Sequence, residues 1–181
     1  MRKSSLLLIA VLLLSGCSLS TGDDSTPDVT DVDTPPAGSI YTNDTYNFQF
    51  TYPPGVQVND TGDGVWINNQ ILVVVVSANP EDALGGGMVI ESAEDITVNG
   101  QPARRLRGFI GSIGGNIPQG YDSIVIPHNL LYFIFTAYEL PMNAPLDDAT
   151  LAVRQPGPVP PEIAGLMETI ANSVEFTDSA G

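Results

Sequence analysis

The run from Ile71 to Val76, ILVVVV, constrains the fold more than any other stretch of the chain. Successive side chains of a β-strand point to opposite faces, so six apolar residues in a row place apolar groups on both faces. Such a strand is typical of the centre of a sheet that is covered from two sides. We therefore predict a central strand here, with helices or loops over both faces of its sheet.

Other strand signals lie on both sides of this run. Aromatic and polar residues alternate from Tyr46 to Tyr52, which predicts a strand with four aromatic side chains in the core. Asn99-Gly100 is the favoured two-residue hairpin turn, and a strand over 101–109 returns from it. The remaining predicted strands are 56–58, 65–67, 88–91, 96–98, 121–126, 130–138 and 174–176, with turns at 59–64, 68–69 and 127–129.

Two segments carry helix signals. Residues 79–84, NPEDAL, begin with an N-cap residue and a proline at the first helical position, and three glycines at 85–87 end the helix. From Pro160 to Asn172 the apolar residues form one stripe at helical spacing, which predicts a helix that packs on the sheet. That stripe consists of Ile163, Leu166, Met167 and Ile170.

The first seventeen residues have the layout of a secretory signal. Arg2 and Lys3 precede an apolar run over 6–14, which is shorter than the roughly 20 residues that span a bilayer. The ending Leu14-Ser15-Gly16-Cys17 resembles the lipobox of bacterial lipoproteins, which implies cleavage before Cys17 and a lipid on its thiol. We predict a signal peptide at 1–16, the lipidated cysteine with a tether at 17–40, one domain at 41–178 and a tail at 179–181.

The predicted tether is acidic, with five Asp and three Pro in residues 18–40 and almost nothing to bury. It is either a solvated linker or an acidic segment that binds calcium or a partner protein. Without Arg2 and Lys3 the six basic residues fall to four arginines against 21 acids, a net charge of −17. Such a charge repels nucleic acid and anionic headgroups, so we expect neither as a partner. The membrane contact would run through the lipid on Cys17 alone.

Catalytic and metal motifs are sparse. Cys17 is the only cysteine and His128 the only histidine, so the chain lacks the ligands of a Cys/His zinc site and the partners of a histidine-based triad. We interpret His128 as an exposed turn residue. Ser112 lacks the glycine of a nucleophile elbow. The loop 108–120 contains five glycines and is either a partner-binding loop or a flexible connector. We expect no cofactor.

Three arginines, Arg104, Arg105 and Arg107, lie on the strand that returns from Asn99-Gly100. Alternation places Arg105 and Arg107 on one face and Arg104 on the other. They are a candidate partner surface on an otherwise acidic protein. The alternative is cross-strand pairing with the acids of the preceding strand, Glu91, Glu94 and Asp95.

Three segments together resemble the PsbP-like family, which is named for an extrinsic photosystem protein and shares its fold with a yeast Ran-binding transport factor. They are Phe48–Gly55 with its Tyr-Pro-Pro-Gly ending, Ile96–Arg104 around the hairpin turn, and the closing helix followed by Ser173–Phe176. The resemblance implies an α+β fold in which an antiparallel sheet carries helices on both faces, an α/β/α sandwich. It implies little about activity: members of the family serve as assembly factors or partner-binding modules, and a fold does not transfer a function.

These observations lead to one expected function and two alternatives. We expect a non-catalytic, lipid-anchored domain that faces outside the cytoplasm on the cell membrane or outer membrane and binds or scaffolds an envelope protein. A small-ligand or cation-binding lipoprotein is the first alternative, motivated by the acidic charge. An enzyme using scattered carboxylates such as Glu94 and Asp95 is the second.

Overall fold

The computed structural model describes residues 38–78, 87–111, 117–147, 150 and 154–177. The signal segment with Cys17, the tether up to residue 37, the predicted helix at 79–84 and the tail lie outside the described residues. Contacts divide the chain after Thr34, and everything described below belongs to the unit from Pro35 to Gly181.

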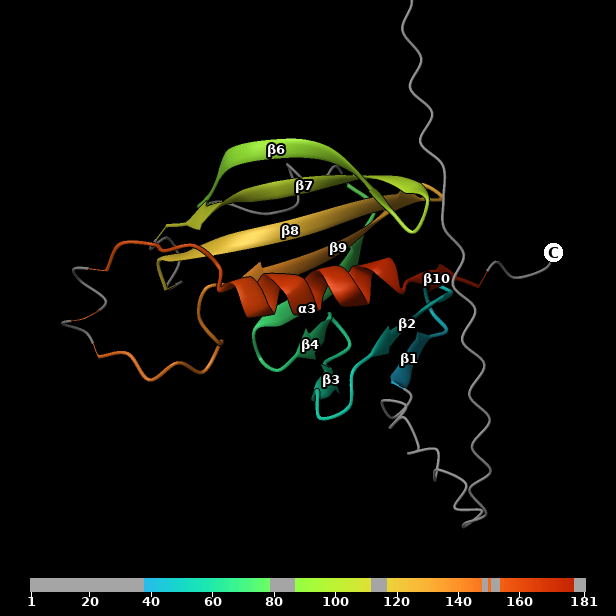
Figure 1. Ribbon diagram of the computed structural model, residues 1–181, viewed down its shortest axis with the longest axis horizontal. Coiled ribbons are helices and arrows are strands. Elements are labelled where there is room, and N and C mark those ends of the chain that lie inside the picture. The colour runs from blue at the N-terminus through green and yellow to red at the C-terminus, as the bar shows by residue number, and fades with distance from the viewer. Residues whose placement is uncertain (1–37, 79–86, 112–116, 148–149, 151–153, 178–181) are drawn as a thin grey trace, which may run out of the picture. The chain divides into compact units, whose positions relative to one another are not determined.

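The described chain is mostly β-strand, arranged in two antiparallel sheets (Figure 1). The smaller sheet has the order β1-β2-β10, and its strands are β1 Ser39–Asn43, β2 Phe48–Tyr52 and β10 Glu175–Phe176. The larger sheet has the order β3-β4-β5-β9-β8-β7-β6. Its strands are β3 Val58–Asp60, β4 Val65–Ile67, β5 Ile71–Val76, β6 Met88–Val98, β7 Gln101–Ile110, β8 Gln119–His128 and β9 Leu131–Tyr138.

Three hairpin turns of the larger sheet have two central residues with positive φ, the turn geometry that matches the twist of the flanking strands. Asn68-Asn69 joins β4 to β5, Asn99-Gly100 joins β6 to β7, and Asn129-Leu130 joins β8 to β9. The first two turns are confirmed as predicted. The third lies later than predicted because β8 continues to His128.

The helix α3, Pro161–Asn172, follows its sequence signals closely. Proline lies in its first turn, where a missing amide donor is tolerated, and Glu162 there is favourable to the helix dipole. Its buried residues are Met167, Ile170 and Ala171. Because α3 packs against β9, β8 and β2, it covers one face of the larger sheet (Figure 1).

The larger core lies under α3 and the smaller sheet. Phe48 and Phe50 of β2 are each 1% exposed and meet Phe133 and Phe135 of β9 edge-on, with ring centroids 5.2 and 6.3 Å apart. Tyr46 was predicted to join this aromatic face, but it lies in the turn before β2 and is 40% exposed. The prediction failed there because the strand begins only at Phe48.

The opposite face of the larger sheet corrects the predicted architecture. The sandwich with helices on both faces is wrong: the described chain is mainly two sheets with one helix of 12 residues. On the opposite face Leu106, Val125 and Ile134 form a second apolar cluster, and the Trp66 ring lies 5.9 Å from that of Tyr138. The run of β5 is apolar on both faces because it joins two such clusters, which does not require a helix over each.

Exposure differs along the larger sheet. In β8 every residue from Gly120 to Ile126 is buried, whereas in β6 every residue from Val89 to Asp95 is exposed. β6 lies at the edge of the sheet, and its pairing with β7 shifts register between Ile90 and Ser92 at a β-bulge. The separate strands predicted at 88–91 and 96–98 are thus parts of one long edge strand.

Candidate functional site

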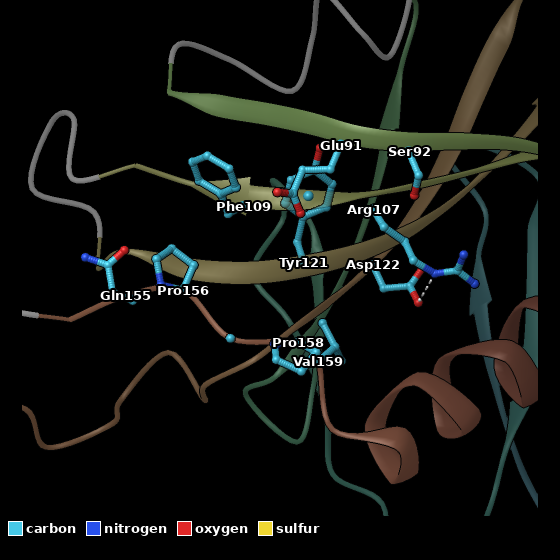
Figure 2. Close-up of a pocket in the computed structure, with 12 residues that line it drawn as sticks. Glu91, Ser92, Arg107, Phe109, Tyr121, Asp122, Gln155, Pro156, Pro158 and Val159 are labelled. Carbon is cyan, nitrogen blue, oxygen red and sulfur yellow. Dashed lines mark hydrogen bonds and ion pairs between the residues drawn. The ribbon is translucent and has the colours of Figure 1, made fainter.

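A cleft of about 680 Å³ opens between strands β6, β7 and β8 and the segment 155–159 that leads into α3 (Figure 2). Pockets for small ligands typically have volumes of about 300–1,000 Å³. The charged residues that line this one are Glu91, Arg107 and Asp122, and its apolar lining includes Phe109 and Pro158. The cleft therefore combines both signs of charge with aromatic and proline surface.

Arg105 lies on the face of β7 that α3 covers, and its side chain is only 14% exposed. Its Nε and Nη2 donate hydrogen bonds to the two carboxylate oxygens of Asp122 at 2.8 and 2.6 Å, and Nη1 donates to Glu168 of α3. The bonds to Asp122 hold the pKa of Arg105 above its ordinary value, although burial opposes this. Arg105 thus ties the helix to the sheet.

Asp122 of β8 is the centre of this network and is 5% exposed. It accepts a further hydrogen bond from Nε of Arg107 at 3.2 Å, drawn as the dashed line in Figure 2. Two guanidinium groups compensate the cost of burying its carboxylate. No sequence pattern indicates the role of Asp122, because that role depends on the register of β7 against β8, where Arg107 lies opposite Asp122.

Arg107 and Arg104 remain closer to solvent. The Arg107 side chain is 44% exposed, and its Nη1 lies 3.6 Å from Oε2 of Glu94. Arg104 Nε lies 4.0 Å from Oδ1 of Asp95. The cross-strand pairing predicted for this hairpin is confirmed for these two arginines, whereas Arg105 turns to β8 and α3. Exposed pairs of this kind contribute only about 0–1 kcal/mol to stability.

The wall of the cleft at 155–159 is anchored by Glu139, the residue after β9. Its carboxylate accepts hydrogen bonds from the amides of Gly120 at 3.0 Å and Gly157 at 2.7 Å, and it pairs with Arg154. A Cβ on Gly120 would lie 1.9 Å from the carbonyl oxygen of Gly157, so the close approach needs glycine. The wall is therefore held in place by side chains far apart in the sequence.

Tyr121 also lines the cleft, and its ring packs in the second apolar cluster. It is 2% exposed, and its Oη donates a hydrogen bond to the carbonyl oxygen of Val89 at 3.4 Å. Gly108 of β7 lies between them, and a Cβ there would be 1.8 Å from the same carbonyl. Burial, with a smaller effect from the charge of Glu91, raises the pKa of Tyr121. The Tyr121 hydroxyl therefore links β8 to the backbone of the edge strand β6.

The described lining contains no histidine, cysteine or lysine. Within the described part of the chain, no group of three or more His, Cys, Asp or Glu side chains is placed to hold a metal ion. The lining offers instead a half-exposed guanidinium, carboxylates, and aromatic and proline surfaces. These groups are suited to recognising a ligand or a peptide.

Two turn predictions need correction. The turn predicted at 59–64 spans only 61–64, where the Thr61 amide donates to the Gly64 carbonyl at 3.0 Å, because the strand predicted at 56–58 is shifted to β3, Val58–Asp60. His128 is not an exposed turn residue: it ends β8, is half-buried, and stacks on Phe176 with ring centroids 3.8 Å apart. The cause is β10, which pairs with β2 and places Phe176 against the histidine ring.

The remaining predicted site residues are separated. Arg105 and Arg107 meet around Asp122 on one face, and Arg104 lies on the other. Cys17 and the centre of the glycine-rich loop, 112–116, lie outside the described residues, while 108–110 and 119–120 belong to β7 and β8. Among the helices that the structure describes, none is long and apolar enough to cross a membrane.

Comparison with known proteins gives a likeness of fold. No protein-family model and no curated protein matches the chain. The chain is similar to the solution structure of cyanobacterial PsbP (CyanoP) from Synechocystis sp. PCC 6803, with 14% sequence identity, a TM-score of 0.46, and coverage of 77% of this chain and 92% of that one. It is also similar to a crystal structure from Bacteroides thetaiotaomicron, with 9% identity, a TM-score of 0.50, and coverage of 80% of this chain and 50% of that one.

At 9% sequence identity and a TM-score of 0.50, the likeness to the Bacteroides structure is one of fold alone. This chain spans half the length of the Bacteroides protein. Because one fold hosts many functions, neither likeness assigns an activity, a ligand or a partner.

Proposed function

We propose that this protein is a lipid-anchored, extracytoplasmic, non-catalytic domain that binds or scaffolds another protein of the cell envelope. The supporting observation is the cleft beside β6, which lies next to seven consecutive exposed strand residues. The buried Asp122 that lines the cleft is engaged by Arg105, which also pairs with Glu168 of α3. Asp122 and Arg105 stabilise the packing of α3 on the sheet. The exposed strand β6 is therefore the surface that a partner can reach.

The anchor in this proposal is a lipid on Cys17. Cys17→Ser should release the folded protein from the membrane fraction, and release should be complete because the net charge of −17 gives no electrostatic help at an anionic surface. Fractionation followed by immunoblotting measures this. A variant that stays membrane-bound and uncleaved would instead indicate an ordinary signal anchor.

Partner binding is testable by photo-crosslinking in intact cell envelopes. A photoreactive amino acid at Ser92, beside the cleft, should give a discrete crosslinked species that mass spectrometry identifies repeatedly. The matched control carries the same amino acid at Thr169, an exposed position of α3. If several positions around the domain, Ser92 included, gave no discrete crosslink, the proposal would be overturned.

A small-ligand lipoprotein is the second candidate, and the volume of the cleft favours it. A thermal-shift scan with calcium, manganese and common metabolites should then find at least one compound that raises Tm. If that compound is a metabolite with an anionic group, Arg107→Ala, which alters the cleft, should remove the shift, whereas Asp63→Ala in the turn before β4 should retain it. Uniformly unchanged Tm values would exclude this candidate.

A further inference from the structure

We propose that the outer edge of β6 accepts an extended basic segment of the partner as an additional β-strand. The basic side chains of that segment would pair with Glu94 and Asp95. This inference rests on the proposed protein-binding function and specifies the chemistry of the partner.

The geometry of β6 suits strand addition. β6 is the last strand of the sheet, with β7 on one side, and no strand of the described chain pairs with its other side. Beyond the bulge, Ser92 to Val98 pairs with β7 in one regular register. That length exceeds the mean strand of about 5–6 residues, so a partner strand of ordinary length would find a continuous edge.

The acids on β6 select the charge of the added strand. Glu94 and Asp95 point to opposite faces, and their side chains are 63% and 97% exposed. Directly opposite residues of an added strand would lie beside them, and opposite charges there are favourable. The arginines of this protein reach these acids only at 3.6 and 4.0 Å, so the acids remain accessible to a second cation.

The same charges argue against a second copy of this chain on the edge. A second β6 would bring its own Glu94 and Asp95 to the interface, and the chain has a net charge of −15. Like charges directly opposite each other destabilise a strand pair. Acids that protect an edge from self-association therefore also discriminate in favour of a basic strand.

A role of the acids in preventing self-association does not explain the N-terminal end of β6, before the bulge. Val89 and Ile90, before the bulge, are 44% and 38% exposed. Adjacent exposed apolar residues on an edge favour association, and edges that are only protected avoid them. We interpret Val89 and Ile90 as the apolar part of the same docking edge.

A defined peptide tests the charge selection. The full-length chain is titrated into a fluorescent, acetylated and amidated peptide, Thr-Val-Thr-Lys-Arg-Val-Thr-Val, and anisotropy is recorded. We expect saturable binding that Glu94→Lys/Asp95→Lys weakens by about tenfold or more, since two opposite-charge pairs become like-charge pairs. The control Asp63→Lys/Glu162→Lys makes the same charge change at exposed residues away from β6, and should bind within about twofold of the wild type, the difference reflecting net charge.

A second pair of peptides tests backbone pairing. Methylating every second amide nitrogen removes the donors on one edge of the peptide, so one of the two alternate series should abolish binding and the other should leave it intact. Equal binding of both methylated peptides would reduce the contact to electrostatics and overturn the inference. No binding of the parent peptide up to millimolar concentration would overturn it too.

The envelope crosslink separates this inference from the proposed function. If Glu94→Lys/Asp95→Lys keeps the crosslinked partner at Ser92 while the parent peptide fails to bind, a protein partner exists but does not add a basic strand to β6. If the crosslink and the peptide binding are both absent, both proposals fall. If the double variant loses both while its Tm stays within a few degrees of the control, both are supported.

Discussion

The hairpins β6–β7 and β8–β9 lie side by side in the larger sheet but are stabilised differently (Figure 1). The first has a favoured turn, Asn99-Gly100 at φ 46° and 77°, and an exposed outer strand. The second has Leu130 at φ 65°, a region that is strained for residues with a Cβ, and two largely buried strands. Local turn chemistry specifies the first hairpin, whereas burial overrides it in the second.

The difference also concerns charged residues. Asp122 in the buried hairpin is held by two arginines, while Glu94 and Asp95 in the exposed hairpin make long, solvent-exposed pairs. The Asp122 carboxylate of the buried hairpin β8–β9 is therefore a structural group. The carboxylates of Glu94 and Asp95 in the exposed hairpin β6–β7 are available for recognition.

The largest effect should come from Asp122→Ala. This variant leaves the buried Arg105 guanidinium without its main partner, which should lower the free energy of unfolding by about 3–5 kcal/mol. Urea unfolding followed by circular dichroism measures this. The matched control is Glu94→Ala in the exposed hairpin, which should change stability by less than about 0.5 kcal/mol. Equal effects of the two variants would break the comparison.

The next effect concerns the hydroxyl pair of Ser123 and Thr136, which lie opposite each other on β8 and β9 at 0% and 3% exposure and 2.9 Å apart. Ser123→Ala leaves the Thr136 hydroxyl without its partner, so we expect a loss of about 1–3 kcal/mol in chemical unfolding. Adding Thr136→Val should recover part of that loss. Ser92→Ala on the exposed strand is the control and should be close to neutral. A double variant that is no more stable than the single one would contradict this account.

A smaller effect should appear at alkaline pH through Tyr138 of β9. Burial raises its pKa from 10.0 to about 12, so the folded state retains a phenol proton that the unfolded state loses. Stability should therefore be intact below pH 10 and fall as pH rises from 10 to 12, by about 2 kcal/mol for this group. Tyr138→Phe should reduce that fall, measured by urea unfolding at pH 8 and pH 12. If Tyr138→Phe lost as much stability between pH 8 and pH 12 as the wild type does, this prediction would be wrong.

The smallest effect should come from exchanging the two turns. Gly100→Leu places a leucine at positive φ in the exposed hairpin, as Leu130 is in the buried one. We expect a loss of about 1 kcal/mol in stability from the backbone strain alone, because a Cβ at position 100 meets no atom within 4 Å. Leu130→Gly should raise stability by about 0.5–1 kcal/mol. Thermal unfolding of both variants measures this. If Leu130→Gly were destabilising, the 94% exposed Leu130 would have a structural role that its position does not explain.

Sequence patterns predicted the elements better than their arrangement. The turns Asn68-Asn69 and Asn99-Gly100, the strand β5 and the helix α3 all follow from local spacing and turn chemistry. The prediction of helices on both faces of the sheet was wrong. A strand that is apolar on both faces indicates that both faces are buried, but it does not indicate whether helices, strands or loops bury them. Of the candidate site, the arginine alternation was predicted and the central Asp122 was not.

The sequence alone determined the strand β5, the turns Asn68-Asn69 and Asn99-Gly100, the stripe of α3 and the acidic charge, because these depend on residues within a few positions of one another or on composition. Only the tertiary structure decided that Arg105 meets Asp122, 17 residues away, and Glu168, 63 residues away. It also decided that Gly120 meets Gly157 at the wall of the cleft. Such contacts depend on strand register and on the packing of α3, which local propensities do not specify.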